Sequence, residues 1–257
     1  MVRRIAFINE KGGTGKTTLA VNVAAYLAQK KGRRVLLVDL DTQGHAAKCL
    51  GIDSREARPN VFHLLTGAGV RLADVVRETA IEGLQVVPSW KEMAEFPTLA
   101  AADPQRARRL LKALEAAREW DVVLFDAPPS MGLATTNVLV AATEVVVPVA
   151  TTYLALDGCA ELVETVRQVS QAHAHPSLAV TLVVPTLYRK TALADEVVAK
   201  LGEYFPGQVT EPLGFNVAID EAQSHGQTIW EYAPWSRGAT MMQLVAEAVD
   251  RGRPATS

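Results

Sequence analysis

Two lysines and three threonines stand among three glycines, directly after a short apolar segment, in the order Glu10-Lys11-Gly12-Gly13-Thr14-Gly15-Lys16-Thr17-Thr18. Glycines let a loop wrap a phosphate chain with several N–H groups pointing inward, and the N-terminus of a following helix adds positive potential. In such a loop Lys16 reaches the β- and γ-phosphates, and the Thr17 hydroxyl binds Mg²⁺. The pattern therefore predicts a site for ATP or ADP with Mg²⁺, held by residues 11–18.

Three carboxylates follow later apolar segments. The run 35–38 ends in Asp39, and Asp41 comes two residues later. Residues two apart on an extended segment project to the same side, so we expect both aspartates to face the phosphates. The run 122–125 ends in Asp126, an arrangement in which a buried strand holds a carboxylate near Mg²⁺ or its water. We expect Asp126 to contact the metal through water.

A parallel sheet is needed to bring these groups together. Helical spacing of apolar residues predicts helices over Lys16–Lys31 and Pro104–Glu119, and we expect short helices within 53–80. We therefore expect an α/β fold with a doubly wound, mostly parallel β-sheet and helices on both faces. Residues 1–250 are expected to form one domain and 251–257 a flexible tail. Continuously apolar runs, typical of strands buried on both faces, predict strands at Ile5–Asn9, Val35–Leu40, Leu84–Pro88, Val122–Asp126, Val145–Val149 and Leu178–Val184.

Composition narrows the class of protein. Hydrophobic residues make up 49% and charged residues 21% of the 257 residues, which excludes a disordered chain. The net charge of −2 excludes a protein that coats nucleic acid, so any DNA contact must come from a local patch. The two cysteines lack metal-site spacing, and the four tryptophans are expected to pack in the interior. With no run of about 18 apolar residues and no signal peptide, we expect a cytoplasmic protein without a membrane contact.

The glycine loop departs from the ordinary phosphate-binding pattern, because Glu10 replaces the first glycine and Lys11 adds a second lysine. This deviant Walker A motif resembles that of the ParA/Soj-type ATPases, within the wider group of P-loop ATPases that includes MinD. The resemblance covers nearly the whole chain and is strongest over 4–51 and 121–158. It implies an ATP-dependent homodimer in which Lys11 reaches the phosphates bound by the other subunit, and slow hydrolysis of ATP that a partner stimulates.

The resemblance also implies roles for single residues. The segment from Asp39 is similar to Asp-x-Asp-Pro-Gln-Gly-Asn, with Thr42 and His45 in place of proline and asparagine. Asp41 is then expected to position the attacking water beside the metal, and to act in catalysis with Lys11 and Lys16. Two later loops imply adenine contacts by Thr186 and Asn216.

The C-terminal segment 216–226 resembles the ParA pattern Asn-Val-Arg-Leu-Ser-Glu-Ala-Pro-Ser-His-Gly but reads Asn-Val-Ala-Ile-Asp-Glu-Ala-Gln-Ser-His-Gly. Members of that branch bind DNA without sequence preference through surface lysines and arginines. Ala218 and Phe215 stand where arginines are common. Phosphate contacts need cations but no fixed sequence, so other cations can substitute. The candidates are Arg189, Lys190, Lys200 and Arg237.

Three functions are compatible with these features. The leading one is a dimerising ATPase that partitions a chromosome or plasmid, with an ATP dimer that binds non-specific double-stranded DNA at the nucleoid and a ParB-like activator. The alternative is a protein-directed positioning switch that does not bind DNA, which the alanine at position 218 favours. The third is a P-loop enzyme that transfers phosphate to a small molecule. The last helical segment is better explained by core packing than by a membrane anchor.

Overall fold

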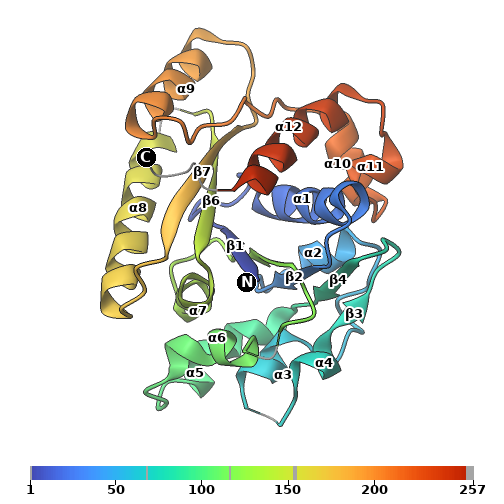
Figure 1. Ribbon diagram of the computed structural model, residues 1–257, viewed down its shortest axis with the longest axis vertical. Helices are drawn as coiled ribbons and strands as arrows, with labels where there is room; N and C mark the ends of the chain where they lie inside the picture. Colours follow the sequence, from blue (N-terminus) through green and yellow to red (C-terminus); the bar gives the residue numbers. More distant parts are fainter. Residues whose placement is uncertain (1, 68, 116, 153–154, 253–257) are drawn as a thin grey trace.

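A seven-stranded sheet forms the centre of the computed structural model, which describes residues 2–67, 69–115, 117–152 and 155–252 (Figure 1). The strand order is β3-β4-β2-β5-β1-β6-β7, and every neighbouring pair is parallel apart from the antiparallel pair β3–β4. This confirms the expected α/β class. The strands are β1 (Arg3–Phe7), β2 (Val35–Asp39), β3 (Arg77–Glu78), β4 (Leu84–Val87), β5 (Val122–Asp126), β6 (Glu144–Ala150) and β7 (Ala179–Thr186).

All six predicted strands are present, and β5 has the predicted bounds. The strand that the sequence did not predict is β3, a two-residue edge strand paired with β4. Its residues are charged and exposed or half-buried, so they carry no apolar pattern from which a strand could be predicted.

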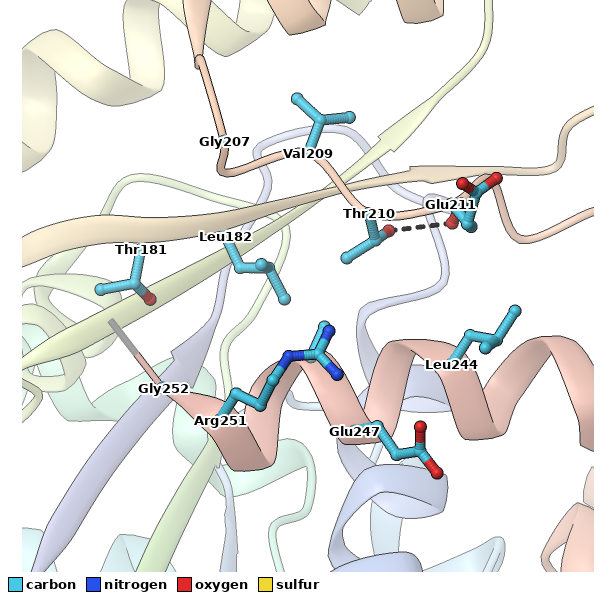
Figure 2. A pocket seen from close by; sticks show the side chains of 11 residues that line it. Thr181, Leu182, Gly207, Val209, Thr210, Glu211, Leu244, Glu247, Arg251 and Gly252 are labelled. Carbon is cyan, nitrogen blue, oxygen red and sulfur yellow. Dashed lines mark hydrogen bonds between the residues drawn. The ribbon is translucent and has the colours of Figure 1, made fainter. Parts of the chain in front are cut away.

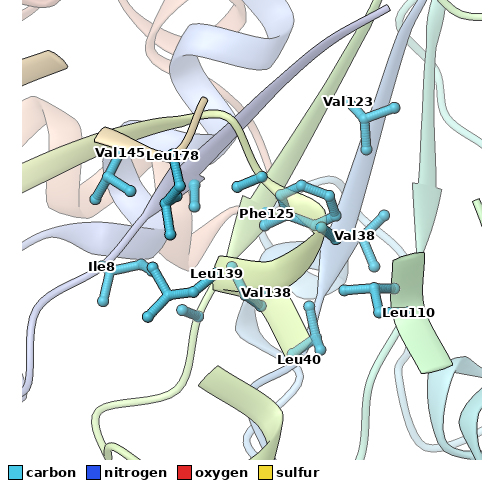
Figure 3. Close-up of a cluster of buried hydrophobic side chains, with 14 of the residues drawn as sticks. Ile8, Val38, Leu40, Leu110, Val123, Phe125, Val138, Leu139, Val145 and Leu178 are labelled. Carbon is cyan, nitrogen blue, oxygen red and sulfur yellow. The ribbon is translucent and has the colours of Figure 1, made fainter. Parts of the chain in front are cut away.

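Helices cover both faces of the sheet (Figure 1), and each face has its own apolar core. One core includes the side chains of Phe125, Val138 and Leu139, seen in Figure 3. Its helices are α3 (Val61–Leu65), α4 (Leu72–Val75), α5 (Phe96–Leu99), α6 (Arg109–Ala113), α7 (Leu133–Ala141), α8 (Ala155–Ala172) and α9 (Ala192–Tyr204). The other face carries α1 (Lys16–Lys31), α2 (His45–Lys48), α10 (Val217–Ser224), α11 (Ile229–Tyr232) and α12 (Arg237–Arg251).

The predicted helix Lys16–Lys31 is confirmed to the residue as α1, and α3 and α4 confirm the short helices expected within 53–80. The predicted helix Pro104–Glu119 is wrong in extent. It is divided into a 3₁₀ turn, η2 (Arg106–Arg108), and the short α6. The side chain of Asn137 lies between them, where its Oδ1 accepts from the Leu110 N–H and its Nδ2 donates to the Arg106 carbonyl. These are the two backbone groups that would bond to each other in a continuous α-helix.

The C-terminal part of the chain differs from expectation at two places. The flexible tail was predicted to begin at residue 251, but Arg251 belongs to α12. Residues 253–257 of the predicted tail lie outside the described residues. Trp235 was expected to pack, but it lies in the turn before α12 and 97% of its surface is exposed. Among the described residues, no helix combines the length and apolar character needed to cross a bilayer.

Candidate nucleotide-binding site

Three strand ends bring the predicted chemistry to one edge of the sheet. Strand β5 lies between β1 and β2, and Asp126 is in register with Phe7 on one side and with Asp39 on the other. The glycine loop begins three residues after Phe7, so it emerges beside both aspartates. This is the carboxyl edge of the sheet, where ligands of doubly wound folds bind.

The glycine loop is held open at this edge. Gly13 and Gly15 have φ of 71° and 87°, a left-handed conformation that favours glycine. A Cβ added at Gly12 or Gly13 would meet no described atom within 4 Å, so the loop borders open space. Helix α1 begins at Lys16 without a side-chain cap, which leaves its first N–H groups for a ligand. Of the loop residues, Lys11, Gly12 and Gly13 are exposed, Thr14 and Lys16 are buried, and Gly15, Thr17 and Thr18 are half-buried.

Asn9 fixes the start of the loop, a role that sequence reasoning missed. Its Oδ1 accepts from the Lys11 N–H at 2.9 Å, and its Nδ2 donates to the Pro148 carbonyl at 2.6 Å. The loop is thereby tied to β6. A buried asparagine directly after an apolar strand is the signal that could have identified this residue.

Lys16 points back into the loop. Its Nζ donates to the Lys11 carbonyl at 3.1 Å, and only 7% of the residue is exposed. Burial lowers the pKa of Lys16, and the nearby carboxylates of Asp126 and Asp41 oppose that shift. A buried ammonium has three N–H donors, and the carbonyl of Lys11 takes one of them, so Lys16 can donate charge-assisted hydrogen bonds to phosphate oxygens.

Asp126 is buried without a hydrogen bond to either carboxylate oxygen among the described residues. Burial raises the pKa of Asp126, and the neighbouring Thr17 hydroxyl is the main influence that lowers it. The charge of Asp41 raises it further, and that of Lys16 lowers it. A buried carboxylate left unpaired in this way needs a cation or water as its partner.

Both oxygens of Asp39 are engaged within the protein, while the expectation that Asp39 and Asp41 face the phosphates stays a prediction. Its Oδ1 accepts from the Asp41 N–H at 2.9 Å and its Oδ2 from the Ala46 N–H at 3.1 Å, so both oxygens hold the loop after β2. Burial, followed by the charge of Asp126, raises the pKa of Asp39. Strand β2 ends at Asp39, so the alternation of an extended strand, on which the prediction relied, does not continue to Asp41.

Asp41 lies in the turn beyond β2 and is half-buried. Its Oδ1 accepts from the Gln43 N–H at 3.0 Å, which fixes the orientation of the carboxylate. Its charge acts on both Lys16 and Asp126. Asp41 is thus close enough to Lys16 and Asp126, the residues with which it was predicted to act, to influence their charges.

Three further predicted contact residues are bonded within the protein. Thr186, at the end of β7, is buried and donates through Oγ1 to the Thr14 carbonyl at 2.9 Å. Asn216 caps α10 by accepting from the Ala218 N–H at 3.1 Å. The Thr18 hydroxyl accepts from Gln223 Nε2 at 2.9 Å. These bonds show how each side chain is held, while direct contacts to nucleotide stay predictions.

The four candidate cations do not all lie together. Arg189 stacks on the Phe215 ring, with 5.2 Å between its Cζ and the ring centroid, and Lys190 is the next exposed residue. Arg237 is exposed at the start of α12. Lys200 lies on α9, which packs on the other face of the sheet, and it pairs with Glu196 at 2.8 Å. The first three flank one end of the α10–α12 region.

Three cavities lie away from the glycine loop, and no loop residue lines any of them. One of about 490 Å³ lies between β7, the segment 207–211 and α12, and Glu211, Leu244, Glu247 and Arg251 are among the residues that line it (Figure 2). A second of about 970 Å³ borders α3, α4 and α6, and a third of about 770 Å³ lies at the opposite edge of the sheet beside Arg3 and Arg4. The candidate site is therefore an open edge and not one of these cavities.

Comparisons with known proteins agree with this geometry. A family model described as an AAA domain matches residues 2–180. The sporulation initiation inhibitor protein Soj of Bacillus subtilis is 38% identical over 252 residues, which cover 97% of this chain and 98% of the relative. The chromosome-partitioning ATPase Soj of Thermus thermophilus is 41% identical over 250 residues, 96% of this chain and 95% of the relative.

A solved structure with a bound nucleotide analog has a similar fold. The chain superposes with a TM-score of 0.84 on cobyrinic acid a,c-diamide synthase from Mycobacterium smegmatis, a structure with bound ATP analog and magnesium. The two are 29% identical, and the match covers 98% of this chain and 95% of that chain.

Proposed function

We propose a function from the fact that this chain belongs to the ParA/Soj family of partitioning ATPases. The protein is an ATP-dependent dimerising switch that binds non-specific DNA and partitions a chromosome or plasmid. The observation that carries this proposal is the buried carboxylate of Asp126, which has no hydrogen-bond partner by geometry among the described residues and lies near the Thr17 hydroxyl and the Lys16 ammonium. The proposed location is the cytoplasm, at the nucleoid.

The residues present fit a magnesium nucleotide. Hydroxyl and carboxylate oxygens are the ligands that Mg²⁺ prefers, and neither oxygen of Asp126 has a hydrogen-bond partner within the part of the chain that the structure describes. Among the described residues no group of three or more histidine, cysteine, aspartate or glutamate side chains suits a metal, so phosphate oxygens would complete the ligand set. Thr17 would hold the ion directly, Asp126 through water, with Asp41 nearby. When bound, Mg²⁺ neutralises charge on the phosphates.

The chain's own residues then account for hydrolysis. The carboxylate of Asp41, fixed through Oδ1 by the Gln43 N–H, orients the attacking water. Lys16 stabilises the charge that develops on the transferred phosphoryl group. The Lys11 backbone is anchored by Asn9 while its side chain lies on the exposed part of the loop, where it can reach a nucleotide in a second subunit.

Contacts to DNA are assigned to the cations that flank α12. Arg189, Lys190 and Arg237 are exposed and can bind phosphates of any sequence. Lys200 would contribute only if its ion pair with Glu196 opened. The activator would be a ParB-like protein that stays bound to the cargo and stimulates hydrolysis.

One observation favours the alternative, a positioning switch directed by proteins that does not bind DNA. Ala218 is half-buried against the core that α1 and α12 share, and the Phe215 ring lies against Arg189. Both positions at which related sequences commonly carry arginine are therefore apolar here.

Retention of non-specific double-stranded DNA tests the two functions. The protein carries Asp41→Ala, to preserve the ATP dimer, and is loaded with ATP or ADP across a salt series. We expect retention with ATP alone that falls steeply with salt, since each phosphate contact releases a counterion. Arg189→Ala should reduce the salt slope by about one.

The controls separate DNA binding from dimerisation. Adding Lys11→Ala should abolish both the ATP dimer and DNA retention, whereas Lys30→Ala, the same change at an exposed lysine near the other end of α1, should leave both intact. Loss of DNA retention with an intact ATP dimer would favour the protein-directed switch. An ATP dimer that forms normally with Lys11→Ala would refute the proposed role of Lys11.

A further inference from the structure

One side chain on α10 contacts both helices of the nucleotide edge. Gln223 donates through Nε2 to the Thr18 hydroxyl at 2.9 Å, in the first turn of α1. Its Oε1 lies 3.9 Å from the Sγ of Cys49, the C-cap residue of α2. Gln223 therefore bridges the helix that begins at the phosphate loop and the helix that follows the Asp41 turn.

Helix α2 is itself tied to the turn at the end of β2, because Asp39 accepts from the Ala46 N–H. The contact between α10 and α2 extends past Gln223. A Cβ added at Gly226, in the turn after α10, would lie 3.1 Å from the Gly51 Cα, so the two backbones are in close contact. A shift of the Asp41 turn would therefore move α2 and alter its contacts with α10.

The opposite end of α10 packs against the start of α12. A Cβ added at Gly238 would lie 2.6 Å from the Oδ1 of Asn216, which caps α10. Helix α10 thus spans from the phosphate loop to the surface that carries Arg237. The pattern that segment 216–226 resembles has proline at position 223, and a proline side chain could make neither contact of Gln223.

We propose that Gln223 is a positioning residue that holds α10 against α2 and transmits nucleotide occupancy from Thr18 to that contact. The transmission rests on the proposed nucleotide site. Nucleotide that orders the first turn of α1 fixes the Thr18 hydroxyl, and this strengthens the hold of Gln223 on the end of α2. A ligand at one site changes a second site only through such a difference in contacts.

The rate at which Cys49 is alkylated reports how often α10 and α2 separate. Cys49 is 6% exposed, so iodoacetamide reaches it only when α10 and α2 separate. The rate at Cys49 is followed by mass spectrometry of its peptide, with and without MgADP. Cys159, buried on α8 on the other face of the sheet, is an internal control in the same molecule. The variant is Gln223→Met, which keeps the length of the side chain and removes both polar groups.

Gln227→Met is the matched control, since Gln227 is exposed and its side chain makes no hydrogen bond among the described residues; its backbone N–H donates to the Ala222 carbonyl. We expect Gln223→Met to speed alkylation of Cys49 by about twofold to tenfold, the effect of losing one hydrogen bond. MgADP should slow the wild-type reaction by a similar factor and have no effect on the variant. Cys159 should react at one rate throughout.

Equal Cys49 rates in wild type and Gln223→Met would overturn the proposal, and so would protection by MgADP that survives the substitution. Calorimetric titration of ADP separates this outcome from failure of the proposed function. If ADP does not bind the wild-type protein, the nucleotide site is wrong, and the nucleotide-free rates still decide whether Gln223 holds α10.

Thr18→Val provides a second variant that removes the same bond from the other side. If Gln223 acts through Thr18, the double variant should alkylate no faster than Gln223→Met alone, because the two substitutions delete one shared contact. Rates that multiply in the double variant would show that Gln223 does not act through Thr18.

Discussion

The ends of β2 and β5 carry aspartates at the same level of the sheet, in register with each other, and both are fully buried. At the end of β2 each oxygen of Asp39 accepts a backbone N–H. At the end of β5 neither oxygen of Asp126 has a hydrogen-bond partner among the described residues. A buried carboxylate with saturated oxygens holds its own chain together, whereas one with unsatisfied oxygens costs stability that only a ligand can offset.

Asp126→Asn is expected to have the largest effect of the substitutions that test this difference. The amide removes a buried charge and weakens the metal site, so hydrolysis of ATP should fall by roughly 100-fold. The nucleotide-free protein should meanwhile gain about 1 kcal/mol in its free energy of unfolding, because the cost of burying the charge of Asp126 outweighs the opposing influence of the Thr17 hydroxyl and the Lys16 ammonium. Phosphate release and urea denaturation measure the two quantities. Unchanged hydrolysis would remove Asp126 from the site.

Gly44→Ala tests whether the turn after β2 is as rigid as the bonds to Asp39 indicate. Gly44 has a φ of 60°, and a Cβ there would lie 2.4 Å from the Ser89 carbonyl oxygen. We expect a loss of about 3 kcal/mol in the free energy of unfolding. Gly207→Ala is the control, since its φ is also positive but its Cβ would meet nothing within 4 Å. The control should cost about 1 kcal/mol, and equal losses would show that the turn has room to move.

The same comparison shows what the sequence could predict. The run that ends in Asp126 was predicted to the residue, because a continuously apolar strand with a terminal carboxylate is a local pattern. The bonds of Asp39 depend on where β2 stops and where the chain turns back at Ala46, which no spacing rule encodes. Asn137 is a similar case, since its side chain interrupts a helix about 30 residues away in the sequence. Contacts between distant segments decided each of these details.

Asp39→Asn should act in the opposite direction to Asp126→Asn. The new NH₂ group must face either the Asp41 N–H or the Ala46 N–H, which leaves one buried donor without an acceptor. We expect a loss of about 2 kcal/mol in the free energy of unfolding, measured by urea denaturation beside Asp126→Asn. If both substitutions changed stability in the same direction, the two strand ends would not differ as their hydrogen bonds indicate.

Thr186→Val extends the comparison to the end of β7, where a neutral hydroxyl supports the phosphate loop. Valine keeps the shape of threonine but leaves the Thr14 carbonyl without its 2.9 Å bond from Oγ1. We expect a loss of about 1 kcal/mol in the free energy of unfolding and a fall in ADP affinity of a few fold, because the loop is held less firmly. Thr186→Ser retains the hydroxyl and should keep the affinity near wild type. An affinity that falls in Thr186→Ser but not in Thr186→Val would indicate that the methyl group, 3.9 Å from the position that a Cβ on Gly15 would take, supports the loop instead of the hydroxyl.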